Sequence, residues 1–330
     1  TITNIGGGAF NSCTKLKEII IPSSVEIIEG GSFGNCISLI EITIPSTVKY
    51  VHERAFNNCT KLERIKIDLY QTKIERNSFE NCSKLNHLIF LPTVSSIQFF
   101  EFDDYFKLKE ITIPESVFII KQHGFCKCST LERISIPTSV KVIEEESFKE
   151  CSSLTNIIMP KSITTISKGC FNKCSSLTEI FIPDSVTSIE ENAFSECASL
   201  RKIIIPKTTK FINKGCFMKC SSLTEISIPS SITTIEEHLF DGCTSLVNIT
   251  IPTSITRIKR NSFTGCISLR EISIHNSVKV IEEESFKECI SLTEIIIPSS
   301  ISNIENQAFK GCIKIQTVKM NPYKTLFNIN

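Results

Sequence analysis

The chain has 330 residues, of which 36 are basic and 35 acidic, and its formal net charge is +1. This balance removes the electrostatic attraction on which most binding to nucleic acid or to an anionic membrane depends. The sequence contains no apolar run of about 18 residues, the length that a membrane-spanning helix needs, and it does not open with a signal peptide.

One pattern returns every 23 residues from one end of the chain to the other. Cysteine occupies every such position from Cys13 to Cys312 except one, which is Tyr105, and phenylalanine lies three residues before each of them. No repeat needs an insertion or a deletion to keep this period of 23 residues. A fixed period of this length predicts a solenoid, because a single repeat cannot bury its apolar side alone.

The order of residues within a repeat predicts a strand followed by a turn segment. Leu154, Ile157 and Met159 have the L-x-x-L-x-L spacing of leucine-rich repeats. Residues 157 and 159 alternate with residues 156 and 158, as in a strand with one buried face. Pro160 ends this strand, since it has no N–H for the ladder. Residues 144–151 are predicted to form one or two tight helical turns.

The repeat I-x-I-P-x-S-V-x-x-I-x-x-x-[AS]-F-x-x-C-x-x-L-x-x-I resembles the BspA-like leucine-rich repeats over essentially the whole chain. The resemblance implies a leucine-rich-repeat solenoid of the α/β type, mostly parallel β, with about 14 gap-free coils. Its concave side would be a parallel sheet and its convex side short helical or 3-10 turns. Proteins of this family are often placed at cell surfaces and linked to adhesion or host contact.

The unbroken period predicts a single domain over residues 1–330. Within it, the repeats are irregular over 67–108, and residues 321–330 form a degenerate C-terminal cap. Thr1–Ile5 fits the middle of a repeat, so residue 1 need not be the native N-terminus. The first coil has no polar cap sequence, and we expect its open strand edge to invite pairing with a second molecule.

The irregular region carries an aromatic cluster that includes Phe99, Phe100 and Tyr105. Phe99 and Phe100 lie off the core positions and should be partly exposed. One interpretation is local repacking around a tyrosine larger than the cysteine it replaces. The other is a second binding or self-association patch on the convex side.

Sixteen cysteines would ordinarily suggest disulfides. Here the cysteines of the repeat all point the same way into the core, and such parallel side chains suit the disulfide torsion poorly. We therefore predict reduced, structural thiols, which favours a reducing compartment such as the cytoplasm, or an anaerobic organism. The family resemblance favours the cell surface instead, so the location stays open.

The predicted binding residues lie on the concave sheet. Ile158, Phe181 and Ile204 occupy the same exposed position on consecutive strands and should form an apolar ridge, with Glu179 and Lys202 beside it. The ridge has the composition of a protein-binding hot spot, an aromatic with aliphatic neighbours and a charged rim. The alternative is that these residues simply suit strands.

The sequence contains no catalytic or nucleotide-binding motif, and its histidines fall at unrelated positions of the repeat. We therefore predict no enzyme, no cofactor and no metal site. The preferred hypothesis is a protein-binding scaffold that uses the concave face, similar to BspA-like adhesion proteins. The alternative is an intracellular regulatory scaffold that binds a cytosolic enzyme such as a protein phosphatase. The open N-terminal edge and the aromatic patch would be two routes to a homo-oligomer.

Overall fold

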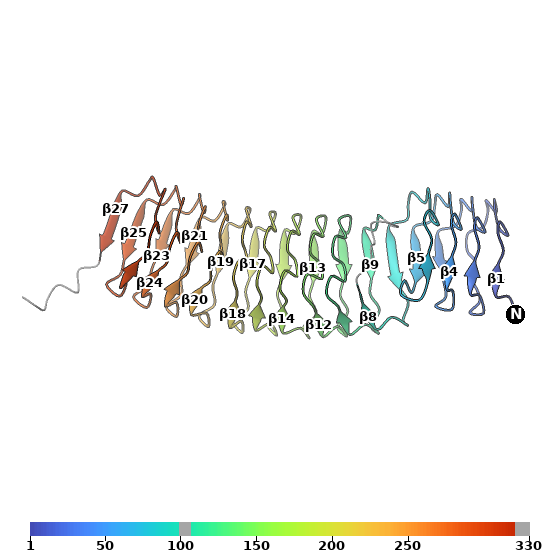
Figure 1. Cartoon of the computed structure of the whole chain (residues 1–330), viewed down its shortest axis with the longest axis horizontal. Helices are drawn as coiled ribbons and strands as arrows, with labels where there is room; N and C mark the ends of the chain where they lie inside the picture. Colours follow the sequence, from blue (N-terminus) through green and yellow to red (C-terminus); the bar gives the residue numbers. More distant parts are fainter. Residues whose placement is uncertain (99–106, 321–330) are drawn as a thin grey trace, which may run out of the picture.

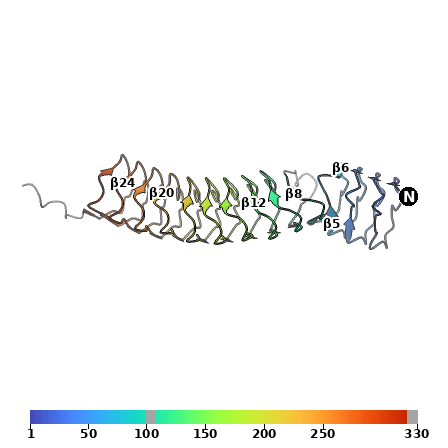
Figure 2. The same cartoon turned by 90° about the horizontal axis from the view of Figure 1, so that it is seen from below.

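The protein is a stack of similar coils, described by a computed structural model over residues 1–98 and 107–320. The coils follow one another along an elongated rod, with the first and last coils at opposite ends (Figure 1). A view turned by 90° shows the same stacking along the whole length (Figure 2). The predicted leucine-rich-repeat solenoid is therefore confirmed. The predicted patch at Phe99, Phe100 and Tyr105 and the predicted cap at 321–330 lie outside the described residues.

One parallel sheet of thirteen strands runs along the rod, and each strand pairs with those of the neighbouring coils. Paired residues are one period apart, as in Ile134 with Ile157 and Ile203 with Ile226. The strands of this long sheet are β3 (Glu41–Thr43), β5 (Arg64–Ile67), β7 (His87–Phe90), β9 (Glu110–Thr112), β11 (Arg133–Ser135), β13 (Asn156–Ile158), β15 (Glu179–Phe181), β17 (Lys202–Ile204), β19 (Glu225–Ser227), β21 (Asn248–Thr250), β23 (Glu271–Ser273), β25 (Glu294–Ile297) and β27 (Thr317–Met320).

A second side of each coil carries a two-residue strand, and these strands form four short parallel sheets. They are β1 (Asn4–Ile5), β2 (Ile27–Ile28), β4 (Tyr50–Val51), β6 (Lys73–Ile74), β8 (Ser96–Ile97), β10 (Ile119–Ile120), β12 (Val142–Ile143), β14 (Thr165–Ile166), β16 (Ser188–Ile189), β18 (Phe211–Ile212), β20 (Thr234–Ile235), β22 (Arg257–Ile258), β24 (Val280–Ile281) and β26 (Asn303–Ile304). β1 ends the first short sheet, and its use as a pairing edge stays a prediction.

The core between these sides is one continuous apolar cluster with a column of stacked phenylalanines. The rings of Phe148, Phe171 and Phe194 are fully buried, and consecutive ring centroids lie 5.4 Å and 5.5 Å apart with nearly parallel planes. Offset stacking of this kind is favourable for aromatic rings. Burial of each ring contributes about 1.5–3 kcal/mol, so the column is a large part of the stability.

The sequence predicts helical turns on the third side of each coil, which follows the short strand and is called the turn side below. The described residues contain no helix, and this side consists of hydrogen-bonded turns instead. Glu146 and Glu150 have φ of 53° and 62°, and such left-handed residues end a right-handed helical run. The Cys151 N–H donates to the Phe148 carbonyl in its own coil at 3.2 Å, but the Phe148 N–H donates to Cys170 of the next coil at 2.9 Å. The turns thus join the coils as the strands do.

The cysteines of the repeat form a second ladder beside the phenylalanines, and all sixteen cysteines are free. The Cys151 thiol donates to the carbonyl of Phe125 in the preceding coil, with a sulfur–oxygen distance of 3.1 Å. Most coils repeat this bond at the same spacing, as Cys174 does with Phe148 at 3.0 Å. A buried thiol that already donates to a carbonyl is a structural group, as the sequence predicted.

Candidate functional site

The ridge of Ile158, Phe181 and Ile204, called the apolar ridge below, stands on the exposed face of the long sheet. The three residues lie on β13, β15 and β17, and each is paired in register with the next. Their exposed fractions are 68%, 62% and 63%. Strand alternation explains this exposure, because the residue before each of them points into the core instead.

The charged residues predicted beside the ridge are in place, but they do not pair with each other. Glu179 and Lys202 are neighbours in register on β15 and β17. The Lys202 ammonium contacts the carboxylate of Glu225 on the next strand at 2.9 Å. Over 1–98 and 107–320, Glu179 has no ion-pair partner. Glu225 thus joins the candidate site, although the sequence analysis did not include it among the binding residues.

A hollow of about 1160 Å³ lies on the same face beside Ile204. It forms because the position of Ile204 is taken on the next two strands by the smaller Ser227 and Thr250. The change from large apolar to small hydroxyl side chains in one column was visible in the sequence and could have located it. The exposed side chains around the hollow belong to Asp184, Lys202, Ile204, Lys207, Thr208, Glu225, Ser227, Ser230, Asn248 and Thr250.

Asp184 and Lys207 are two further charged residues that sequence reasoning missed. Each follows the proline that ends its strand segment, and both are exposed and line the hollow. Because they come after the strand, no strand periodicity points to them. They place charges on the opposite side of the ridge from Glu179 and Lys202.

A second groove, of about 910 Å³, runs along the turn side over six coils. One wall carries residues of alternating charge on consecutive coils, and the other carries small residues, mostly serine. The alternating wall consists of Lys127, Glu150, Lys173, Glu196 and Lys219. Lys173 and Glu150 lie 3.6 Å apart, so part of this alternation stabilises the stack itself.

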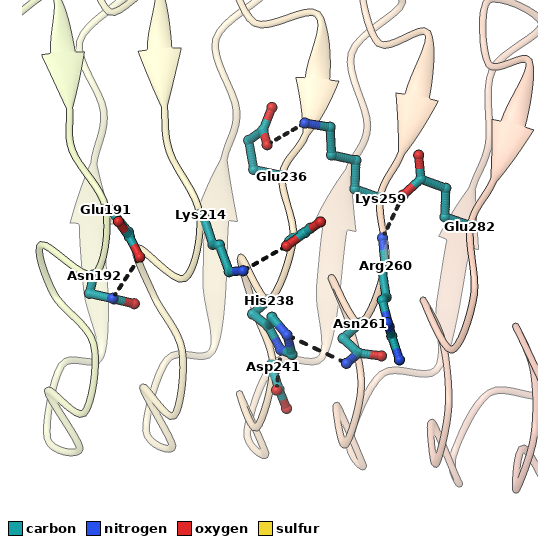
Figure 3. A network of polar contacts seen from close by, with 11 residues as sticks. Glu191, Asn192, Lys214, Glu236, His238, Asp241, Lys259, Arg260, Asn261 and Glu282 are labelled. Carbon is teal, nitrogen blue, oxygen red and sulfur yellow. Dashed lines mark hydrogen bonds and ion pairs between the residues drawn. The ribbon is translucent and has the colours of Figure 1, made fainter.

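The polar network of Figure 3 has the same alternating character on another line of the turn side. Lys214 contacts Glu237 of the next coil at 2.7 Å, and Lys259 contacts Glu236 at 2.7 Å. His238 contacts Asp241 at 2.8 Å within its own turn. Exposed pairs of this kind contribute about 1 kcal/mol or less each, so this network is a feature of coil stacking.

Within 1–98 and 107–320, the structure brings together no group of three or more His, Cys, Asp or Glu residues that could hold a metal ion. In the same ranges, no helix has the length and apolar character that crossing a membrane requires.

Comparison with known proteins gives matches to repeat families. The model of the BspA type leucine-rich repeat region, which has six copies, matches residues 1–105, 95–224 and 210–329. A leucine-rich repeat protein from Bacteroides ovatus is 28% identical, with 84% of this chain and 86% of that chain covered and a TM-score of 0.62. A leucine-rich cell surface protein from Faecalibacterium prausnitzii is 27% identical, covers 84% of this chain and 80% of its own, and has a TM-score of 0.49. No curated protein matches the sequence.

Proposed function

Because the chain belongs to the BspA-type leucine-rich repeat family, we propose that it is a non-catalytic scaffold that binds a protein partner through the exposed face of its long sheet. The observation that carries the proposal is the apolar ridge. Three large apolar side chains on consecutive strands are each more than 60% exposed. A contiguous exposed apolar patch with a charged rim is the usual composition of a protein-binding surface.

The hollow next to the ridge is a second observation that supports binding through this face of the sheet. A partner side chain placed there would contact the apolar wall of Ile204 and the hydroxyl groups of Ser227 and Thr250. Polar groups next to an apolar anchor give a bound side chain a defined orientation. The ridge would therefore supply the affinity, and the hollow with its charged border would supply specificity.

Two forms of this proposal differ in the partner. In the adhesion form, which the family resemblance supports, the partner is a surface or matrix protein of another cell. In the regulatory form, the partner is a cytosolic enzyme such as a protein phosphatase. The free, buried cysteines support the regulatory form, because unpaired thiols are typical of a reducing compartment.

The test is a quantitative pull-down with the wild type, the Phe181→Asp variant and the Phe211→Asp variant. Phe211 is a matched control, since it is 60% exposed against 62% for Phe181 but lies on β18 of the short-strand side. We expect Phe181→Asp to weaken capture by about tenfold, the loss of a typical hot-spot residue, while the control binds normally. Both variants should melt like the wild type, because both residues are exposed.

The source of the captured protein separates the two forms. A partner from the native cytosol supports the regulatory scaffold, and one from a host-surface extract supports adhesion. If Phe181→Asp and wild type recover every partner equally, the ridge is not the binding site. A Phe181→Asp protein that melts early would show that the residue acts in folding, which would also contradict the proposal.

A further inference from the structure

The charges on either side of the apolar ridge indicate what kind of partner segment it accepts. Resting on the proposed function, we propose that the ridge binds an extended segment of a partner protein with a basic residue on each side of an apolar one. The pattern is basic–x–apolar–x–basic. The apolar residue would contact Phe181, and the two basic residues would pair with Glu179 and Asp184.

The coil of β15 places Phe181 between two carboxylates. Glu179 is two residues earlier on the same exposed strand face, and Asp184 follows the end of the strand and borders the hollow. Both are exposed, and in the described part of the chain neither has an ion-pair partner. An acidic side chain of the partner placed next to Glu179 or Asp184 would be repelled by the like charge, and a basic side chain would be attracted by the opposite charge.

The next coil carries the reverse charges. Ile204 lies between Lys202 and Lys207 on the coil of β17. Lys202 is already paired with Glu225 at 2.9 Å, whereas Lys207 has no ion pair among the described residues. A basic segment shifted by one coil would therefore be repelled. Because adjacent coils carry opposite charges here, they select both the charge of the partner segment and the coil on which it binds.

An extended segment matches the strand part of this arrangement. Its side chains at positions i, i+2 and i+4 point to the same face, about 6.8 Å apart. Glu179 and Phe181 are also two positions apart on β15, so they match the first two of these side chains. Asp184, three positions after Phe181 and beyond the strand, would pair with the third. The aromatic ring of Phe181 can in addition contact a neighbouring cation on its face.

A second copy of the chain that is centred on Phe181 is a poor occupant of the ridge. If two such ridges face each other across a two-fold axis along β15, Asp184 lies opposite Asp184 and Lys161 lies opposite Lys207. With the axis along the rod instead, Glu179 lies opposite Asp184 and Lys202 lies opposite Lys207. Both centred arrangements bring like charges together, which is destabilising, so the charges around Phe181 favour a basic segment of a different protein.

The test is selection from a phage-displayed library of random linear heptapeptides on the immobilised full chain. Peptides that also bind Phe181→Asp are removed by counter-selection. We expect the remaining peptides to carry Lys or Arg two positions before and two positions after an apolar residue. Their synthetic versions should bind the double variant Glu179→Lys, Asp184→Lys about tenfold more weakly than the wild type.

A matched control is the double variant Glu150→Lys, Glu196→Lys, which changes the charge equally on the turn-side groove and should bind the peptides normally. Phe181-dependent peptides with acidic or neutral flanks would overturn this inference and leave the proposed function intact. Equal loss of binding in both double variants would show a general charge effect and would also overturn it. If no selected peptide depends on Phe181, the inference fails, and the pull-down with Phe181→Asp decides the proposed function separately.

Discussion

The cysteine of each repeat acts as both a small apolar residue and a hydrogen-bond donor. The carbonyl of Phe125 accepts two hydrogen bonds, one from the Cys128 N–H at 3.2 Å and one from the Cys151 thiol of the next coil at 3.1 Å. Alanine could fill this position without the bond. Serine would carry a more polar group into a core where its remaining hydrogen-bonding capacity has no use. Cysteine suits both demands at once.

Replacing Cys151 by alanine should therefore lower the free energy of unfolding by about 1 kcal/mol, through the lost donor and a small void. The Phe125 carbonyl keeps its bond from Cys128, so the loss should not be larger. Urea unfolding followed by circular dichroism measures it. Cys126→Ala is the control, because Cys126 is half-buried beside the column and should change stability by less than about 0.5 kcal/mol. Equal effects of the two substitutions would contradict the role given to the thiol.

At the scale of the element, charges that alternate along the rod link neighbouring coils in pairs over residues 168–283. Lys168 contacts Glu191 at 3.0 Å, Lys214 contacts Glu237 at 2.7 Å, and Arg260 is 3.5 Å from Glu283. These residues occupy one position of the repeat on six consecutive coils, so the sign changes at every coil. The alternation has a period of two coils, although the backbone has a period of one.

Lys214→Glu should destabilise the protein, since it places three consecutive carboxylates about 4.8 Å apart along this line. We expect a loss of about 1 kcal/mol at low ionic strength that shrinks in 0.5 M salt, because salt screens exposed charges. Urea midpoints at the two salt concentrations measure this. Lys210→Glu is the control, because its neighbours one coil away, Thr187 and Thr233, are uncharged. A loss that does not depend on salt would rule out the electrostatic explanation.

On the scale of the whole molecule, the stack should tolerate loss of two coils better than loss of one. Deletion of 168–213 removes two coils and joins Ser167 to Lys214, so Lys214 and Lys219 follow Glu145 and Glu150. Deletion of 168–190 removes one coil and places Glu191 and Glu196 after the same two glutamates. This shorter deletion brings like charges together at two positions of the repeat. We therefore expect the variant with the shorter deletion to have the lower melting temperature. Thermal melts by circular dichroism test this, and the opposite order would contradict it.

The buried thiols also determine how the whole stack responds to alkali. Burial raises the pKa of the Cys36 thiol to about 11 from its ordinary value of 9.0, and it raises the pKa of Cys170 and Cys220 as well. As the pH rises above 9, the unfolded chain therefore loses thiol protons before the folded chain does. Stability should be maximal with respect to these groups below pH 9 and should fall between about pH 9 and 11. Urea midpoints in reductant that stay constant from pH 8 to 10.5 would contradict this.

Much of the candidate site could be predicted from the sequence, because it depends on strand alternation. Once one strand was aligned with the period, the exposure of Ile158, Phe181 and Ile204 on consecutive strands followed. The partner of Lys202 did not follow, since Glu179 and Glu225 lie one coil away on either side and only side-chain positions distinguish them. Asp184 was missed because it follows the strand, where no periodicity applies.

The sequence by itself determined the coil, its period and the register of the long sheet, because a repeat without insertions leaves only one way to stack its apolar columns. The tertiary structure alone decided the form of the turn side, where Glu146 and Glu150 adopt left-handed conformations that their residue types do not favour. It also decided that the thiol of Cys151 bonds to Phe125 of the coil before. These features depend on atoms that the neighbouring coil supplies, and such atoms lie a whole repeat away in the sequence.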